Sequence, residues 1–149
     1  MPTVTIQREK SVKLFLDTSA FAKRYVAEAG SGKLLALCQE ADQLAVSVIC
    51  VPELISTLAR LVREKKLSKA EYRKLKGHVM ADLADVEVCQ LDAGVLVATT
   101  SLLEAYSLRA MDALHLACAL GSASDKFVSA DHRQLTAARK AGLTVVDVS

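Results

Sequence analysis

Five short apolar runs alternate along the chain with longer stretches whose apolar residues recur at helical spacing. The runs occupy residues 14–16, 44–48, 86–89, 127–129 and 143–146. In the first run, Leu14, Phe15 and Leu16 are consecutive and do not alternate with polar residues. This is typical of a strand covered on both faces, as in a parallel sheet between helices. The pattern predicts a three-layer, Rossmann-like α/β fold with a mainly parallel five-stranded sheet.

The intervening stretches predict helices. We expect helices over residues 19–28 and 31–41, from Pro52, from Ser68, from Asp92 to near Ser107, over 109–120, and before Gly142. Ser68 and Glu71 have the spacing of a capping box, which marks a helix start. Apolar residues occupy nearly every side of the 109–120 segment, so we expect this helix to be buried. Within it, Asp112 and His115 lie one turn apart on a shared face.

The length and composition predict one ordinary globular domain. The chain has 149 residues, with 52% hydrophobic and 24% charged residues, which argues against disorder. We expect a core over residues 13–148 and an N-terminal extension over 1–12. That extension lacks the apolar centre of a signal peptide, and no run approaches the ~18 apolar residues of a membrane span. We therefore expect a cytoplasmic protein that does not enter a membrane.

The four cysteines form no closely spaced pair. Cys38, Cys50, Cys89 and Cys118 lie far apart in apolar surroundings, so we interpret them as small buried hydrophobic residues.

Four carboxylates are the main candidates for chemistry. Asp17 and Asp131 follow predicted strands, Glu53 begins a helix after a strand, and Asp112 lies in the apolar helix. Helix capping and the helix dipole could explain three of them individually. Open α/β sheets, however, bind ligands at the carboxyl ends of their strands. If the four acids converge there, Mg²⁺ or Mn²⁺ would relieve their repulsion and activate water for phosphodiester hydrolysis.

Positive charge is concentrated in one segment. Residues 60–76 contain eight basic and two acidic residues, a net charge of +6, whereas the whole chain has a net charge of +2. The rest of the chain therefore carries −4. A solvated pair of helices would explain the segment, and so would contact with RNA phosphates or a partner protein. The candidate contact residues are Arg63, Lys65, Lys66 and Lys69.

Four motifs carry a resemblance to a known family. They are Leu16-Asp17-Thr18-Ser19, Pro52-Glu53-Leu54, the segment from Arg109 to Ala117, and Ser129-Ala130-Asp131. In order and approximate spacing they resemble the motifs of PIN-domain ribonucleases, above all the VapC-type toxins of toxin–antitoxin pairs. The resemblance extends over residues 13–148.

The resemblance implies a Mg²⁺- or Mn²⁺-dependent endoribonuclease that forms a homodimer and is inhibited by a small antitoxin protein. It also implies that the catalytic, metal-binding residues are Asp17, Glu53, Asp112 and Asp131. Polar support would come from Thr18, Ser19 and Ser129.

His115 has two interpretations. It could be a metal ligand or general base beside Asp112, or a buried histidine that hydrogen-bonds the backbone or a carboxylate. We favour the second interpretation because Mg²⁺ prefers oxygen ligands.

Two alternative functions are open at this point. A PIN domain could act in RNA processing or cleave DNA, because metal-activated water does not require a 2′-hydroxyl group. A response-regulator-like signalling domain also has acids at strand ends. It would need an acidic pair after the first strand and a phosphoacceptor Asp after the third. Here Thr18 and Ser19 follow Asp17, and the third run leads into Gln90-Leu91.

Overall fold

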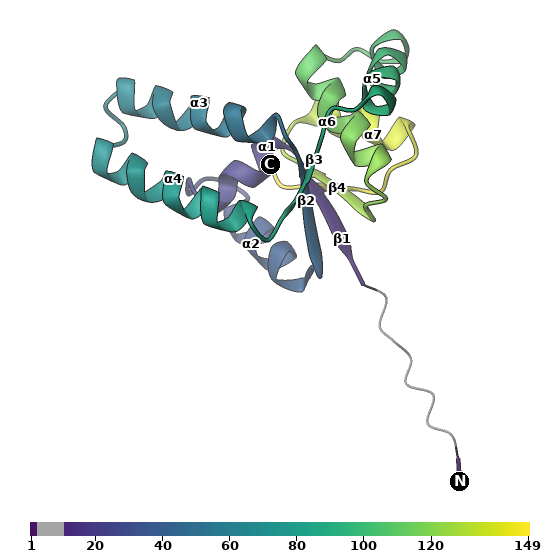
Figure 1. Cartoon of the computed structure of the whole chain (residues 1–149), viewed down its shortest axis with the longest axis horizontal. Helices are drawn as coiled ribbons and strands as arrows, with labels where there is room; N and C mark the ends of the chain where they lie inside the picture. Colours follow the sequence, from purple (N-terminus) through teal and green to yellow (C-terminus); the bar gives the residue numbers. More distant parts are fainter. Residues whose placement is uncertain (3–10) are drawn as a thin grey trace.

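The computed structural model describes residues 1–2 and 11–149, and it contains one five-stranded sheet (Figure 1). The strands are β1 (Lys13–Leu16), β2 (Gln43–Ser47), β3 (Glu87–Cys89), β4 (Lys126–Ser129) and β5 (Val145–Asp147). Their order is β3-β2-β1-β4-β5, and every neighbouring pair is parallel. This confirms the predicted α/β class. Most of the predicted N-terminal extension, residues 3–10, lies outside the described residues.

The helices follow the predicted alternation with the strands. They are α1 (Thr18–Phe21), the 3-10 helix η1 (Ala22–Arg24), α2 (Ser31–Glu40), α3 (Cys50–Arg63), α4 (Lys69–Leu83), α5 (Ala93–Ala105), α6 (Ala110–Gly121) and α7 (His132–Lys140). Both halves of the capping box between Ser68 and Glu71 are present at the start of α4.

The prediction of one helix over residues 19–28 is wrong, because the helix is shorter. Regular α-helix ends at Phe21, and the chain tightens into η1 before it turns back toward α2. The buried Lys23 holds this turn, because its Nζ donates to the backbone oxygen of Ala29 at 2.5 Å and to Glu28 at 3.2 Å. Gly30 completes the turn with a φ of 85°, and a Cβ there would lie 1.8 Å from the Val148 oxygen.

Helices cover both faces of the sheet, which explains why its central strand is apolar throughout. Leu14 and Leu16 pack on the side of α1 to α4, with Leu34 and Leu54. On the other face, Phe15 packs with residues of α6 and α7, and its ring stacks on that of Phe127 with centroids 5.9 Å apart. β1 therefore lies in the middle of the molecule, and its carboxyl end is held from both sides.

Burial of α6 and of the cysteines follows the prediction only in part. Ala113 and residues 115–119 of α6 are buried, but Met111 and Leu120 near its ends are exposed. Cys50 and Cys118 are buried, whereas Cys38 and Cys89 are partly accessible. Cys89 lies in β3, which is an edge strand with a neighbour on one side only.

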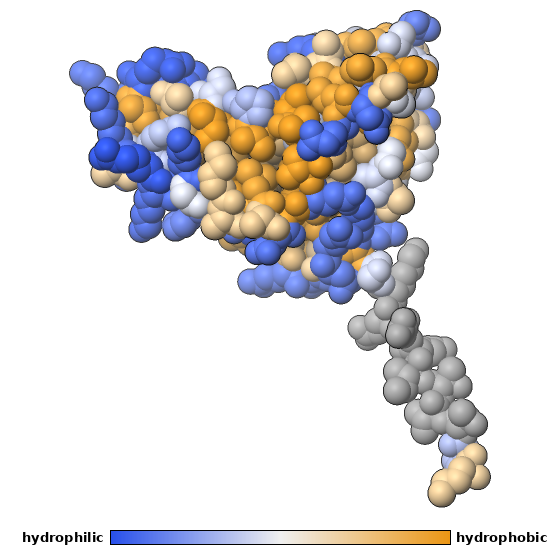
Figure 2. All heavy atoms as spheres, in the orientation of Figure 1, coloured by the Kyte–Doolittle hydropathy of each residue, from blue (hydrophilic) through white to orange (hydrophobic). Residues whose placement is uncertain are grey.

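Two helical lobes extend from the sheet. α3 and α4 form an antiparallel pair, the α3–α4 hairpin, and α5 and α6 lie in the other lobe (Figure 1). In the view of Figure 2, polar side chains gather at the tip of the α3–α4 hairpin, and apolar side chains gather over the lobe of α5 and α6. Among the described residues, no helix is long and apolar enough to cross a membrane.

Candidate active site

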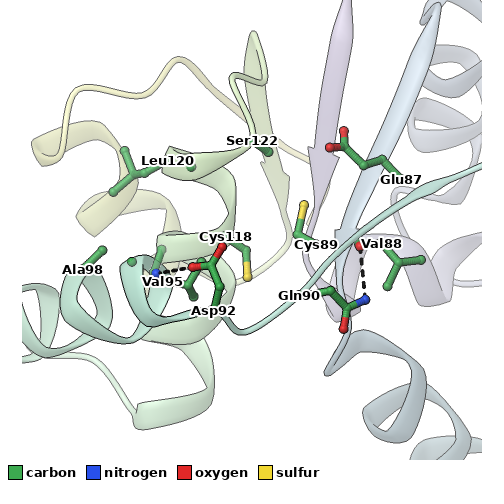
Figure 3. Close-up of a pocket in the computed structure, with 13 residues that line it drawn as sticks. Glu87, Val88, Cys89, Gln90, Asp92, Val95, Ala98, Cys118, Leu120 and Ser122 are labelled. Atoms are coloured by element: carbon green, nitrogen blue, oxygen red, sulfur yellow. Dashed lines mark hydrogen bonds between the residues drawn. The ribbon is translucent and has the colours of Figure 1, made fainter.

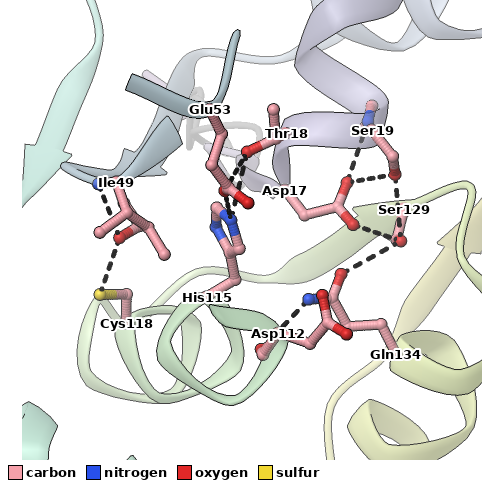
Figure 4. Close-up of polar contacts among 12 residues, drawn as sticks. Asp17, Thr18, Ser19, Ile49, Glu53, Asp112, His115, Cys118, Ser129 and Gln134 are labelled. Atoms are coloured by element: carbon pink, nitrogen blue, oxygen red, sulfur yellow. Dashed lines mark hydrogen bonds and ion pairs between the residues drawn. The ribbon is translucent and has the colours of Figure 1, made fainter. Parts of the chain in front are cut away.

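Three of the four predicted acids, Asp17, Glu53 and Asp112, lie around the carboxyl edge of the central strands (Figure 4). Asp17 directly follows β1, and Ser129 is the last residue of β4, the strand paired with β1. Glu53 is in the first turn of α3, and Asp112 is in the first turn of α6. Asp131 immediately precedes α7. The parallel sheet thus brings together elements that are far apart in the sequence.

Asp17 is buried and fixed by three donors. The Ala20 amide and the Ser19 hydroxyl donate to Oδ1 at 2.9 and 2.7 Å, and the Ser129 hydroxyl donates to Oδ2 at 2.5 Å. Asp17 therefore caps α1, as the simpler interpretation of the sequence proposed, and it also joins β1 to β4. Burial raises its pKa above the usual value, although the bonds from Ser129 and Ser19 act in the opposite direction.

Glu53, Thr18 and His115 form a second group. The Thr18 hydroxyl donates to Glu53 Oε1 at 2.7 Å, and His115 Nε2 lies 2.5 Å from the same oxygen. Burial acts to raise the pKa of Glu53, but the bonds from His115 and Thr18 outweigh it, and the pKa is lowered. Glu53 is therefore ionised at neutral pH. This is the arrangement expected for a buried histidine bonded to a carboxylate, while the function of His115 stays a prediction.

Asp131 caps α7, whereas the carboxylate of Asp112 has no donor among the described residues. Asp131 Oδ1 accepts from the amides of Arg133 and Gln134 at 2.9 and 3.2 Å. Burial raises the pKa of Asp112, and the negative charge of Asp131 raises it further. The charges of Arg109 and His115 oppose this effect. Asp112 and Asp131 are thus like charges close enough to repel each other.

Gln134 is a site residue that the sequence analysis missed. It is buried, donates through Nε2 to the backbone oxygen of Asp112 at 3.1 Å, and accepts from Ser129 through Oε1 at 3.3 Å. It therefore connects α6, α7 and the end of β4. A signal was present in the sequence, because Gln134 belongs to the same apolar stripe as Leu135 and Ala138.

The donor atoms suit a hard divalent cation, but they do not form a ready-made cluster. Across residues 1–2 and 11–149, no three acidic, histidine or cysteine side chains stand close enough to hold a metal ion as they are. The available donors are carboxylate and hydroxyl oxygens, which Mg²⁺ and Mn²⁺ prefer. A cation beside Asp112 and Asp131 would relieve the repulsion that raises the Asp112 pKa. The residues present therefore fit such an ion.

An open cavity of about 470 Å³ gives access to this site. Its walls include Thr18, Glu53, Thr57 and the exposed Met111. Glu53 is therefore reachable from solvent on the side of α3 and α6.

A second cavity, of about 600 Å³, lies between β3 and the helices α5 and α6 (Figure 3). It contains none of the four predicted acids, but Cys89 and Cys118 line it. Burial raises the pKa of both thiols, that of Cys89 to about 11. Neither sulfur is a thiolate at neutral pH, so this cavity offers no activated nucleophile.

Comparison with known proteins identifies the class to which this fold and site belong. The family model described as PIN domain matches residues 14–140, and the chain therefore belongs to the PIN-domain family. Ribonuclease VapC45 of Mycobacterium tuberculosis (strain CDC 1551 / Oshkosh) is 32% identical over 134 residues, which cover 89% of this chain and 93% of the relative. Ribonuclease VapC49 of M. tuberculosis (strain ATCC 25618 / H37Rv) gives the same values.

Solved structures share the fold at lower sequence identity. FitAcB from Neisseria gonorrhoeae has a TM-score of 0.68 at 16% identity and covers 90% of this chain and 96% of its own. VapC20 from M. tuberculosis, a Sarcin-Ricin loop cleaving toxin, has a TM-score of 0.66 at 16% identity, with 90% and 98% covered. VapBC2 from Rickettsia felis, bound to a promoter DNA fragment, has a TM-score of 0.66 at 14% identity, with 93% and 100% covered.

The raised pKa of Asp112 predicts a pH-dependent effect of Asp112→Asn on stability. Between the usual pKa of 3.8 and the raised value, the folded wild type binds more protons at this site than the unfolded chain does. Wild-type stability therefore falls as the pH rises through that interval. Without metal, the free energy of unfolding of Asp112→Asn should equal or exceed that of the wild type at neutral pH. The difference between the two free energies should shrink as the pH falls through the interval.

Urea denaturation in EDTA at several pH values measures this effect. Asp92→Asn is the matched control, because Asp92 caps α5 outside the acid group and asparagine caps equally well. If the free energies of unfolding of wild type and Asp112→Asn change in parallel with pH, the charge of Asp112 does not destabilise the fold.

Proposed function

We propose that this protein is a Mg²⁺- or Mn²⁺-dependent endoribonuclease and the toxin of a type II toxin–antitoxin pair. One observation carries the proposal: the four acids of the PIN motifs lie around one sheet edge, and two of them, Asp112 and Asp131, repel each other. The ribonuclease names of the two curated relatives support the activity. The site residues are Asp17, Glu53, Asp112 and Asp131.

In this mechanism the protein positions anionic oxygen ligands. A bound Mg²⁺ or Mn²⁺ supplies the activation of water and the neutralisation of charge on the phosphate. Asp17 presents a fixed carboxylate because Ser19, Ser129 and the Ala20 amide hold both of its oxygens. Glu53 stays ionised through its bonds to Thr18 and His115. His115 thus acts as a positioning residue that orients Glu53.

We favour RNA over DNA as the substrate, and a nuclease over a signalling domain as the class of protein. Carboxylates alone do not distinguish RNA from DNA, but both curated relatives are named ribonucleases. One structural neighbour is described as cleaving the Sarcin-Ricin loop. The PIN-domain match over residues 14–140 favours a nuclease over a response-regulator-like signalling domain.

An antitoxin is the proposed partner of the α3–α4 hairpin. A cavity of about 570 Å³ lies between the turn after η1 and the hairpin. Its wall has an apolar part, which includes Tyr25, Val26, Leu67 and Leu75, and a charged part with two bases and one acid, Lys66, Lys74 and Glu71. An amphipathic segment with acidic residues would complement these walls. The structural neighbours include a toxin-antitoxin complex from Klebsiella pneumoniae and a member of the VapBC family of toxin-antitoxin systems from Mycobacterium tuberculosis, which supports such a partner.

The distance from the acids supports a partner rather than RNA as the ligand of the basic residues of the hairpin. Arg63 is ten residues after Glu53 on the same helix, which corresponds to about 15 Å along its axis. Glu64 pairs with Lys66 at 3.3 Å and with Arg60 at 3.4 Å, which offsets part of the positive charge. The contact residues in this proposal are Arg63, Lys65, Lys66 and Lys69.

A homodimer is proposed through α5. This helix exposes Leu96, Val97 and Leu103, with exposed fractions of 51%, 69% and 39%. Exposed apolar side chains that gather on one helix mark interaction surfaces, and Figure 2 shows apolar residues over this lobe.

The activity is tested by cleavage of RNA with purified protein. Wild type should cleave in Mg²⁺ or Mn²⁺ and lose activity in excess EDTA. Asp112→Asn should be inactive because the ion loses an anionic ligand, and Asp92→Asn should retain wild-type activity. Full cleavage in EDTA would exclude metal dependence, and near wild-type cleavage by Asp112→Asn would remove Asp112 from the site.

The partner assignment of the hairpin is tested by reversing Lys65, Lys66 and Lys69 to glutamate. The variant should cleave RNA like the wild type but resist inhibition by the antitoxin, taken as the protein encoded beside this gene. The dependence of RNA affinity on salt should not change. A decrease in the slope of log K against log salt by about 0.7 per lysine would instead assign the hairpin to RNA.

The dimer is tested by sedimentation of Val97→Glu, which places a charge in the proposed interface. Wild type should sediment as a dimer and this variant as a monomer. Leu35→Glu is the control, because Leu35 is 45% exposed on α2, away from α5, and should leave the dimer intact. A wild-type monomer, or a dimer that survives Val97→Glu, contradicts the proposal.

A further inference from the structure

A basic cavity lies between the end of α5 and α7. Its volume is about 430 Å³, within the range of ligand pockets. The side chains that line it include Tyr106, Ser107, His132, Arg133, Thr136 and Lys140. Three of these carry nitrogen groups, three carry hydroxyl groups, and none of the eight lining residues is acidic. This set of donors is suited to an anion.

The two permanent cations in this cavity are available to a ligand. Within the described part of the chain, neither Arg133 nor Lys140 pairs with a carboxylate. Two acids border the cavity: Asp147, whose Oδ2 lies 3.7 Å from His132 Nδ1 at the protein surface, and Asp131, which accepts from the backbone amide of Arg133. Arg133 and Lys140 are seven residues apart on α7, which is about 10 Å along the helix axis. Both side chains therefore line the same cavity from one face of the helix.

The cavity adjoins the candidate active site at the start of α7. Asp131 caps this helix, and the two residues that follow it, His132 and Arg133, line the cavity. The Arg133 amide donates to Asp131 Oδ1 at 2.9 Å. A strand of nucleic acid bound at the acids thus has a positively charged surface beside it on this side.

The negative charge of the candidate active site explains why a basic cavity beside it would help RNA to bind. Asp112 and Asp131 repel each other, and the same negative potential opposes the approach of a polyanion. Cations a few residues from Asp131 offset that repulsion for phosphates next to the cleaved bond. We propose that the cavity formed by Tyr106, Ser107, His132, Arg133 and Lys140 binds backbone phosphates of single-stranded RNA that flank the cleavage position. This inference rests on the proposed ribonuclease function.

The test compares Arg133→Gln/Lys140→Gln with Arg139→Gln. Arg139 is also an exposed base in the last turn of α7, but it does not line the cavity. Affinity for a fluorescent single-stranded RNA is measured over a range of salt concentrations in EDTA, so that cleavage does not interfere. Each cation that neutralises one phosphate adds about 0.7 to the slope of log K against log salt, so the slope should fall by about 1.4 in the double variant. Arg139→Gln should keep the wild-type slope.

Binding and cleavage report separately on the two proposals. Equal slopes for the double variant and Arg139→Gln would overturn the RNA assignment, as would a wild-type protein that binds no RNA under these conditions. Tighter binding of an acidic peptide than of RNA, abolished in the double variant, would also overturn it. Failure of wild type to cleave RNA in Mg²⁺ or Mn²⁺ would refute the proposed function, whatever the slopes.

Discussion

The buried carboxylate of Asp17 is the constraint on which the arrangement of the site depends. It follows the central strand and accepts hydrogen bonds from Ser19, Ala20 and Ser129. These bonds start α1, fix the end of β1, and connect it to the end of β4. Because a buried carboxylate is costly unless it is well hydrogen-bonded, the small hydroxyl residues around it are required by the fold itself.

This constraint extends to the other acids through a short network. Ser129 also accepts from the amide of Asp131 at 3.0 Å and donates to Gln134 at 3.3 Å. Gln134 in turn holds the backbone of Asp112. Thr18, next to Asp17 in the chain, donates to Glu53. Structural and catalytic interpretations of these residues are therefore not exclusive, since the same carboxylates that cap helices are held at one sheet edge.

Much of the fold could be predicted because burial on two faces leaves a clear sequence pattern. The run Leu14-Phe15-Leu16 divides its side chains between two cores, and this required helices on both sides. The four acids could be located for the same reason, since each stands at the junction of a strand and a helix or in an apolar helix.

Other features depend on contacts that sequence patterns do not carry. The helix predicted over 19–28 ends early because Lys23 bonds the Ala29 carbonyl, a contact formed only once the turn exists. The bond between His115 and Glu53 joins residues 62 positions apart, and it depends on the fold placing the start of α3 beside α6. Gln134 was missed because its place in the apolar stripe indicates burial but does not identify its partners, Ser129 and the backbone of Asp112.

The central claim of the proposed function is that the four acids together form a site for divalent metal. The most direct measurement is Mn²⁺ binding by electron paramagnetic resonance to the wild type and to four single variants: Asp17→Asn, Glu53→Gln, Asp112→Asn and Asp131→Asn. The account predicts that each substitution weakens the same site and that Asp92→Asn does not. Unchanged Mn²⁺ affinity in any of the four variants would show that its acid lies outside the site, and unchanged affinity in all four would contradict the account.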